Sequence, residues 1–160
     1  LAVSVKTMAD YTVIGVFGLA WPDLLVLDVL RRRMEGPDLP KIAARVWQAY
    51  QPAYFGVESV GFQLSTIQDM RRGGPHETPP RPSLPVKALL PKGDKVTRAL
   101  TLAARMSGGH VYVPQNAPWL ATLFAEMAVF PKGEHDDQVD VLAYAALEAL
   151  DFGDGFVRVS

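Results

Sequence analysis

The sequence contains no cysteine in its 160 residues. This absence excludes disulfide frameworks, thiolate zinc sites and cysteine nucleophiles, and it fits a reducing interior. No apolar run reaches the roughly 18 residues that a membrane-spanning helix needs. The sequence also lacks a GxxxxGK[ST] phosphate-binding loop and a Gly-x-Ser-x-Gly nucleophile motif. Neither P-loop nucleotide hydrolysis nor serine catalysis of that type is therefore indicated.

The start of the chain lacks the features of a secretion signal. There is no initiator methionine, no basic leader and no small-residue cleavage site before Lys6 and Asp10 interrupt the apolar residues. The chain begins on what reads as the inside of a strand. We therefore expect an excised part of a longer protein whose first strand is truncated.

The composition fits one soluble globular domain over residues 1–160, with 49% hydrophobic and 21% charged residues. The net charge of −1 hides a segregation of charge along the chain. Residues 71–105 carry eight basic and two acidic side chains, net +6, whereas residues 106–160 carry two basic and eight acidic ones, net −6. This division is compatible with solvated surfaces, or with a phosphate-facing segment beside a cation-binding one.

The hydrophobic pattern predicts an α/β fold. Closely spaced β-branched runs at 1–5, 11–20 and 24–31 favour an antiparallel meander. Asp38 is expected to cap the next helix, which ends before Pro52. A helix should separate each later strand from the one before it, which favours parallel crossovers. The later strands are expected at 53–59, 86–90 and 110–114, and the later helices at 62–72, 94–106, 117–130 and from Asp136 onward.

This element order is that of a ribonuclease H-like mixed sheet flanked by helices. The segment 73–85 contains five prolines and two glycines, so we expect a mobile surface loop there. Residues 152–160 read as a polar tail.

Acidic residues gather before the last helix, in "GEHDDQVDVLAYAALEAL". Asp136 and Asp137 each lie within one helical turn of Asp140, so these carboxylates share one side of the helix. Simple helix capping by Asp136 would explain part of this pattern. Glu58 is a second isolated acid, at the end of the strand "YFGVE", where ligand crevices of α/β sheets lie. Carboxylates that converge from separate elements favour a bound Mg²⁺ or Mn²⁺ ion.

Several segments together resemble the C-terminal nuclease domain of the large terminase subunit of tailed bacteriophages. They are "ADYTVIGVFG", "LLVLDVLRRRME", "YFGVESVGFQ" and the run from "KVTRALTLAARM" to "FPKGEHDDQVDVLAYAALEAL". The resemblance covers the chain to about residue 150. It implies a ribonuclease H-like fold, metal-dependent cleavage of double-stranded viral DNA with two Mg²⁺ or Mn²⁺ ions, and action in the cytoplasm of an infected bacterium. The terminase ATPase domain, the small terminase subunit and the portal are the implied partners, and no membrane is implied.

The resemblance also implies site residues. Glu58 and Asp137 correspond to metal ligands, and Asp136 and Asp140 are further candidates for the same catalytic cluster. The family's first-strand aspartate would fall directly before Leu1, and Asp10 matches a weaker acidic position that is equally explained as a turn residue. Without that first-strand aspartate, this chain is expected to bind metal incompletely.

The basic segment supplies candidate DNA contacts. Lys95 and Arg98 share one helix face and resemble a basic element of the family, although a solvated face explains them equally well. Arg71, Arg72, Arg81 and Lys87 flank the proline-rich segment, where they would follow a duplex or keep the loop soluble. The arginine run 31–33 follows a strand and is interpreted as a solvated edge.

Two other functions remain compatible with the sequence. One is a junction resolvase or transposase-type nuclease on the same fold, and the other is a non-catalytic module that docks on DNA or the portal. Cleavage of branched against linear DNA would separate the first from a terminase nuclease.

Overall fold

The structure is a computed structural model that describes residues 2–7, 11–59, 63–91 and 93–153. Its centre is a six-stranded mixed sheet in the order β5-β4-β1-β2-β3-β6. The strands are β1 (Ala2–Thr7), β2 (Thr12–Ala20), β3 (Asp23–Arg32), β4 (Tyr54–Glu58), β5 (Val86–Leu89) and β6 (Val111–Tyr112). The first three strands pair antiparallel, β4 runs parallel to β1, β5 runs parallel to β4, and β6 runs parallel to β3. The predicted meander, the parallel crossovers and the α/β fold class are confirmed.

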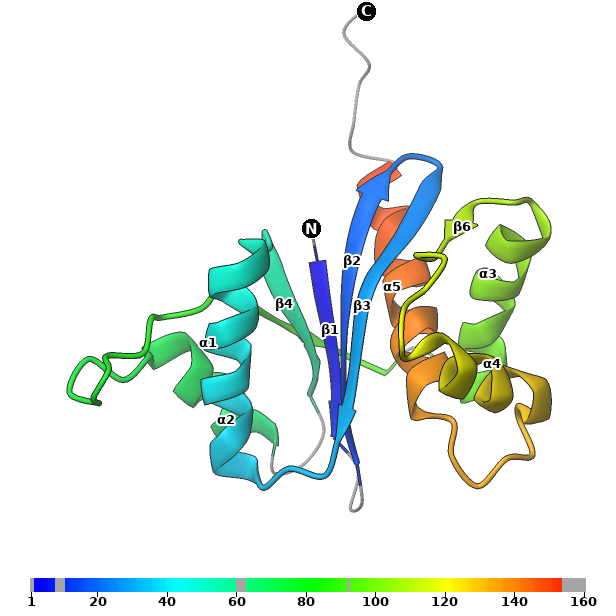
Figure 1. The fold of residues 1–160 in the computed structure, drawn as a ribbon. Coiled ribbons are helices and arrows are strands. Elements are labelled where there is room, and N and C mark those ends of the chain that lie inside the picture. Colours follow the sequence, from blue (N-terminus) through cyan, green and yellow to red (C-terminus); the bar gives the residue numbers. More distant parts are fainter. Residues whose placement is uncertain (1, 8–10, 60–62, 92, 154–160) are drawn as a thin grey trace, which may run out of the picture.

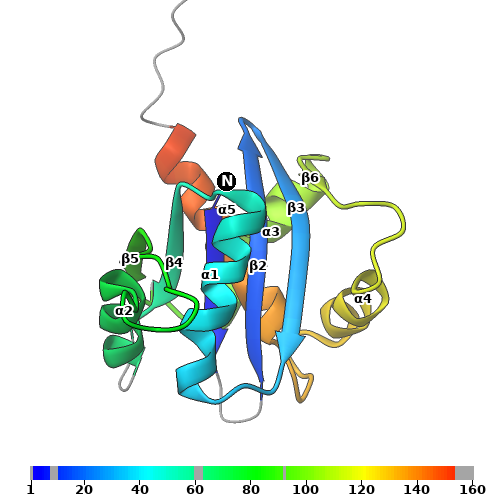
Figure 2. The ribbon, with the colours of Figure 1, turned by 60° about the vertical axis from the view of Figure 1, so that its left-hand side comes forward.

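Helices cover both faces of the sheet, as Figures 1 and 2 show. One face carries α1 (Leu39–Tyr50) and α2 (Gln63–Arg72), and the other carries α3 (Lys95–Ser107), α4 (Leu120–Val129) and α5 (Asp137–Gly153). Each face has its own apolar core. Alternation along β2 divides its side chains between the two, with Val13 and Phe17 facing α5 and Ile14 and Val16 facing α1.

The close packing of α5 on β2 depends on Gly15. A Cβ atom at this position would lie 2.8 Å from Cγ1 of Val141 and even closer to the ring of Phe17. Because no side chain stands there, the first turns of α5 settle directly on the middle of the sheet. The close approach of Gly15 and Val141 sets the position of the acidic start of α5 relative to the ends of the strands.

Asp38 holds the predicted N-cap position of the first helix, but its side chain does not cap the helix. Asp38 closes a short 3-10 turn, η1 (Gly36–Asp38), and has helical backbone angles with no side-chain hydrogen bond to the helix start. The 3-10 turn runs directly into α1, which begins at Leu39. Its other end agrees with the prediction, since α1 stops at Tyr50, before Pro52.

The proline-rich segment is irregular but anchored. Gly74 and Arg81 form an antiparallel bridge, and Leu84 is buried with its amide bonded to the carbonyl of Met70. The Arg81 side chain is only 8% exposed, and its guanidinium pairs with Asp69 and Glu77. Arg81 therefore holds the loop to α2.

One end of the sheet contains the last residues of β1, β3 and β4 and the first residue of β2. Thr7 at the end of β1 pairs with Thr12 at the start of β2, which in turn pairs with Arg32 at the end of β3. Since β4 runs parallel to β1, Glu58 lies at this same end. In the part of the chain that the structure describes, no helix is both long and apolar enough to span a membrane.

Candidate active site

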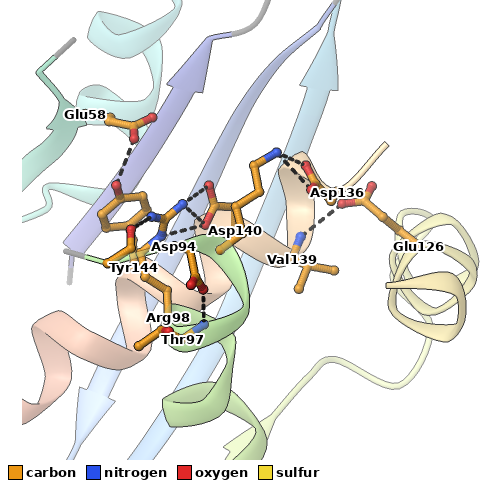
Figure 3. A network of polar contacts seen from close by, with 11 residues as sticks. Glu58, Asp94, Thr97, Arg98, Glu126, Asp136, Val139, Asp140 and Tyr144 are labelled. Carbon is orange, nitrogen blue, oxygen red and sulfur yellow. Dashed lines mark hydrogen bonds and ion pairs between the residues drawn. The ribbon is translucent and has the colours of Figure 1, made fainter. Parts of the chain in front are cut away.

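The acidic end of the sheet is joined to α5 by Tyr144. The Tyr144 hydroxyl donates a hydrogen bond of 2.9 Å to Oε1 of Glu58, the last residue of β4 (Figure 3). Burial of the phenol, and then the nearby Glu58 carboxylate, raise the pKa of Tyr144. Tyr144 therefore remains a neutral donor that fixes the Glu58 side chain relative to α5. Tyr144 lies one turn after Asp140, a helical spacing that the sequence already contained.

Asp140 forms a buried ion pair with Arg98 of α3. Nε and Nη2 of Arg98 each lie 2.9 Å from a different carboxylate oxygen of Asp140, which is a two-pronged pairing. Both side chains are almost completely buried, at 5% and 1% exposure. Burial opposes the charge of Arg98. The hydrogen bonds to Asp140 and the attraction of its carboxylate outweigh this effect and raise the pKa of Arg98. The guanidinium also lies over the Tyr144 ring, 4.9 Å from its centroid.

Lys95, the first residue of α3, holds Asp136. Nζ of Lys95 lies 2.7 and 2.8 Å from the two oxygens of Asp136. Burial works against the charge of Lys95, but Asp136, and then Asp140 and Asp137, raise its pKa. Asp94 caps α3 by accepting a hydrogen bond from the amide of Thr97, and so fixes where this basic turn begins. The basic start of α3 thus faces the acidic start of α5.

Asp137 is the first residue of α5, and it is buried at 5% exposure. Its backbone position is set from α4. The Glu126 carboxylate accepts hydrogen bonds from the amides of Gln138 (2.6 Å) and Val139 (3.0 Å), and a third from the Gln138 side chain (2.8 Å). Helix α5 is therefore capped by a residue of another helix, which the sequence prediction missed. A lone acid in the apolar run "TLFAEMAVF" was the available signal.

The polar face of α5 continues away from the acidic end. Glu148 is one turn beyond Tyr144, where it accepts a hydrogen bond of 2.9 Å from the Tyr54 hydroxyl and pairs with Lys87 at 2.5 Å. Glu148 is itself buried. Burial, and then the Glu148 carboxylate, raise the pKa of Tyr54 above its usual 10.0. Polar contacts therefore join α5 to β4 and to the edge strand β5 along several turns.

The raised pKa of Tyr54 predicts a loss of stability in alkali. The unfolded chain releases the phenolic proton above pH 10 while the folded chain retains it, so this contribution is complete below pH 10 and declines as pH rises further. Above pH 10, the free energy of unfolding should fall with pH less steeply in Tyr54→Phe than in the wild type. The two slopes should differ by about 1.4 kcal/mol per pH unit. Urea unfolding at several pH values measures both slopes. Tyr112→Phe, at an exposed tyrosine of β6, is the control; equal slopes for wild type and Tyr54→Phe would contradict the prediction.

The residues predicted to contact DNA already have partners inside the protein. Lys95 and Arg98 pair with Asp136 and Asp140 as described, and the half-exposed Lys87 pairs with Glu148. Arg72 pairs with Asp69 at 2.7 Å, and the guanidinium of Arg71 binds the carbonyl of Val86. These positions do not show the free basic surface that the charge of residues 71–105 suggested.

The donor chemistry at this end of the sheet suits a hard divalent cation, because Glu58, Asp136, Asp137 and Asp140 offer only carboxylate oxygens. Two of the four are engaged with the cations of α3. In the ranges described, which omit 8–10 and 60–62, no three His, Asp or Glu side chains gather into a metal-binding group. Asp10, the weaker predicted ligand, lies outside the described residues.

Comparisons with solved structures place the fold among viral terminases. The nuclease domain of human cytomegalovirus terminase, soaked with manganese, matches with a TM-score of 0.70 and 13% identity over 98% of this chain and 86% of that one. The large terminase nuclease of the thermophilic phage G20c matches with a TM-score of 0.62 and 20% identity over 91% and 79%. The large terminase of another thermophilic bacteriophage matches with a TM-score of 0.66 and 12% identity over 93% of this chain but 40% of that one. At such identities the likeness shows a shared fold.

The sequence itself gives the family. No curated protein matches it. Residues 8–149 match the model of the terminase RNaseH-like domain, and this range confirms the resemblance found in the sequence motifs. Because the match spans most of its length, the chain belongs to the family of terminase ribonuclease H-like nuclease domains.

Proposed function

We propose that this domain is a divalent-metal-dependent endonuclease that cleaves double-stranded viral DNA during genome packaging. The observation that carries the proposal is the meeting of Glu58, from the end of β4, with the acidic start of α5 through Tyr144. Glu58 at the end of β4 and Asp136, Asp137 and Asp140 at the start of α5 are called the acidic wall below, and in the proposal they line the site that the family fold predicts at this end of the sheet. The match to the terminase family supplies the class of reaction.

Glu58 and Asp137 are the proposed metal ligands, and Asp136 and Asp140 are proposed members of the same cluster. Bound Mg²⁺ or Mn²⁺ supplies an activated water and charge stabilisation for phosphodiester cleavage. The other residues orient this wall. Tyr144 holds Glu58, Arg98 holds Asp140, Lys95 holds Asp136, and Glu126 fixes the helix end that carries Asp137.

The partners follow from the same proposal. A packaging nuclease takes double-stranded DNA as its substrate, and it works with the terminase ATPase domain, the small terminase subunit and the portal. The resemblance of the sequence motifs to phage terminases is the ground for proposing the cytoplasm of an infected bacterium as the place of action, although the fold is shared with the nuclease domain of human cytomegalovirus terminase.

A plasmid assay tests the activity. With supercoiled plasmid and Mn²⁺, Asp137→Asn and Glu58→Gln should each lower the cleavage rate about 100-fold or more, since each removes a charged ligand. EDTA should abolish cleavage. Glu134→Gln is the matched control, because Glu134 is an exposed carboxylate in the same loop. The family's first-strand aspartate, expected before Leu1, does not fit this site, since Ala2 at the start of β1 pairs with Tyr54 at the other end of β4 from Glu58. The assay is therefore run on this chain.

Two outcomes contradict the proposal. Cleavage that survives Asp137→Asn at the wild-type rate would remove Asp137 from the site. DNA binding without cleavage by this chain would instead favour the docking module. Thermal melting of each variant shows whether a lost activity reflects a lost fold.

A further inference from the structure

The end of β3 next to the acidic wall carries a second polar cluster, made of Tyr11, Arg31, Arg33 and His135. The guanidinium carbons of Arg31 and Arg33 lie 4.1 and 5.1 Å from the centroid of the same Tyr11 ring. The His135 ring meets Tyr11 edge-on, with centroids 5.6 Å apart. We call this group the Tyr11 cluster.

The Tyr11 cluster lies on the same face of the sheet as α5. Val13 and Val29 face α5 in the apolar core, and alternation along the strands places Tyr11 and Arg31, two residues further, on that face. The pairing of Val13 with Arg31 agrees with this placement. His135 directly precedes Asp136, so the cluster is continuous in the chain with the acidic wall.

The arginines of this cluster differ from the other cations around the acidic wall. Lys95, Arg98 and Lys87 are each paired with a carboxylate. Within the described ranges, none of Arg31, Arg32 and Arg33 forms an ion pair, and Nε of Arg31 is buried without a hydrogen-bond acceptor. Arg32 and Arg33 are exposed. Two positive charges are thus held against one ring, and no carboxylate among the described residues pairs with either of them.

Such an arrangement suits a phosphate group. A tyrosine face that fixes guanidinium groups reduces the rotamer freedom lost when they bind an anion, and the arginine fork matches phosphate geometry. Phosphate contacts of this kind position a duplex without reading its sequence. Among the described residues, β6 pairs with β3 only at Leu24 and Leu25, so no strand pairs with the outer edge of β3 near Arg31.

We propose that the Tyr11 cluster binds the phosphate backbone of duplex DNA and sets the duplex beside the acidic wall. This inference rests on the proposed function for its ligand. It replaces the interpretation of residues 31–33 as a solvated edge, and it assigns DNA contact to arginines outside the basic segment.

Duplex binding measured without cleavage tests this inference. A fluorescein-labelled duplex is titrated with the chain in EDTA by anisotropy, between about 50 and 200 mM salt. Arg31→Gln with Arg33→Gln should weaken binding and reduce the slope of log affinity against log salt by about 2, one for each phosphate contact. Arg31→Lys with Arg33→Lys keeps both charges and should restore most of the slope.

Lys41→Gln with Arg45→Gln is the matched control, because it removes two exposed charges from α1 on the opposite face. An equal loss in this control and in the Arg31 and Arg33 variant would overturn the inference, since it would show a general charge effect. Unchanged binding in the Arg31 and Arg33 variant would do the same.

A second measurement uses the wild-type chain and so does not depend on folding of a variant. Phenylglyoxal modifies accessible arginines, and duplex DNA should protect Arg33 while leaving Arg45 reactive. Equal modification of Arg33 with and without DNA would also overturn the inference. If the wild type cleaves DNA while Arg33 stays unprotected, the nuclease proposal stands and the DNA-binding role of the Tyr11 cluster fails. If DNA protects Arg33 but is not cleaved, the DNA-binding role stands and the nuclease proposal fails.

Discussion

We expect Arg98→Met to lower the free energy of unfolding by about 3–5 kcal/mol, the usual effect of removing one partner of a buried ion pair. The substitution keeps a long unbranched side chain but leaves the Asp140 carboxylate, at 1% exposure, without its two-pronged donor. It also removes the hydrogen bond from Nη1 to the carbonyl of Gly93 and the contact over Tyr144. Urea unfolding followed by circular dichroism measures the change.

The double variant Arg98→Met with Asp140→Leu separates a lost ion pair from lost packing. When both charges are replaced by apolar groups of similar size, no buried charge remains, and most of the stability should return. Arg45→Met, at an exposed position of α1, should stay within about 0.5 kcal/mol of the wild type. A loss below about 1 kcal/mol in Arg98→Met would mean that water or another group satisfies Asp140.

The ion pairs of α3 account for part of the segregated charge of the sequence. The basic segment 71–105 and the acidic segment 106–160 suggested a DNA surface beside a metal site. In the structure α3 packs against α5 and sets Lys95 and Arg98 on the acids of α5, and Lys87 of β5 pairs with Glu148, so part of the two opposite charges is neutralised inside the protein. These partners lie 41 and 42 positions apart, and no local rule of the sequence relates them.

Strand and helix positions were predictable because their signals are local. β-branched runs, glycine and proline punctuation and helical spacing gave each element to within a few residues. Asp38 shows the limit of this reasoning: it holds the N-cap position of α1, but it is also the last residue of a 3-10 turn and its side chain makes no capping hydrogen bond. Glu58 was recognisable as an isolated acid at a strand end. The ring of Tyr11, which gathers Arg31, Arg33 and His135, joins residues from three separate parts of the chain and left no such trace.

The capping of α5 by Glu126 gives the second large expected effect. We expect Glu126→Ala to lower the free energy of unfolding by about 2–4 kcal/mol, because hydrogen bonds to charged groups contribute about 1.5–3 kcal/mol each and are not additive. The substitution leaves the amides of Gln138 and Val139 without an acceptor at a buried helix start. It also removes a negative charge from the positive end of the helix dipole.

Glu126→Gln distinguishes the capping bonds from the charge. The amide oxygen can still accept from the two backbone amides, but its nitrogen would face the Gln138 nitrogen that now donates to Oε2. We therefore expect a loss of about half that of Glu126→Ala. Thr122→Ala, at an exposed position one turn earlier in α4, is the control for helix α4 itself.

Glu126→Ala also links stability to the proposed site. Asp137 immediately precedes the two amides that Glu126 binds, so fraying of this turn moves the Asp137 carboxylate more than that of Glu58, which is held by Tyr144. Glu126→Ala should therefore lower Mn²⁺-dependent cleavage at temperatures where the variant is still folded, and Glu126→Gln should lower it less. Native-state hydrogen exchange at Gln138 and Val139 reports the local opening directly. Wild-type protection of these two amides in Glu126→Ala would show that α5 begins at Asp137 without help from α4.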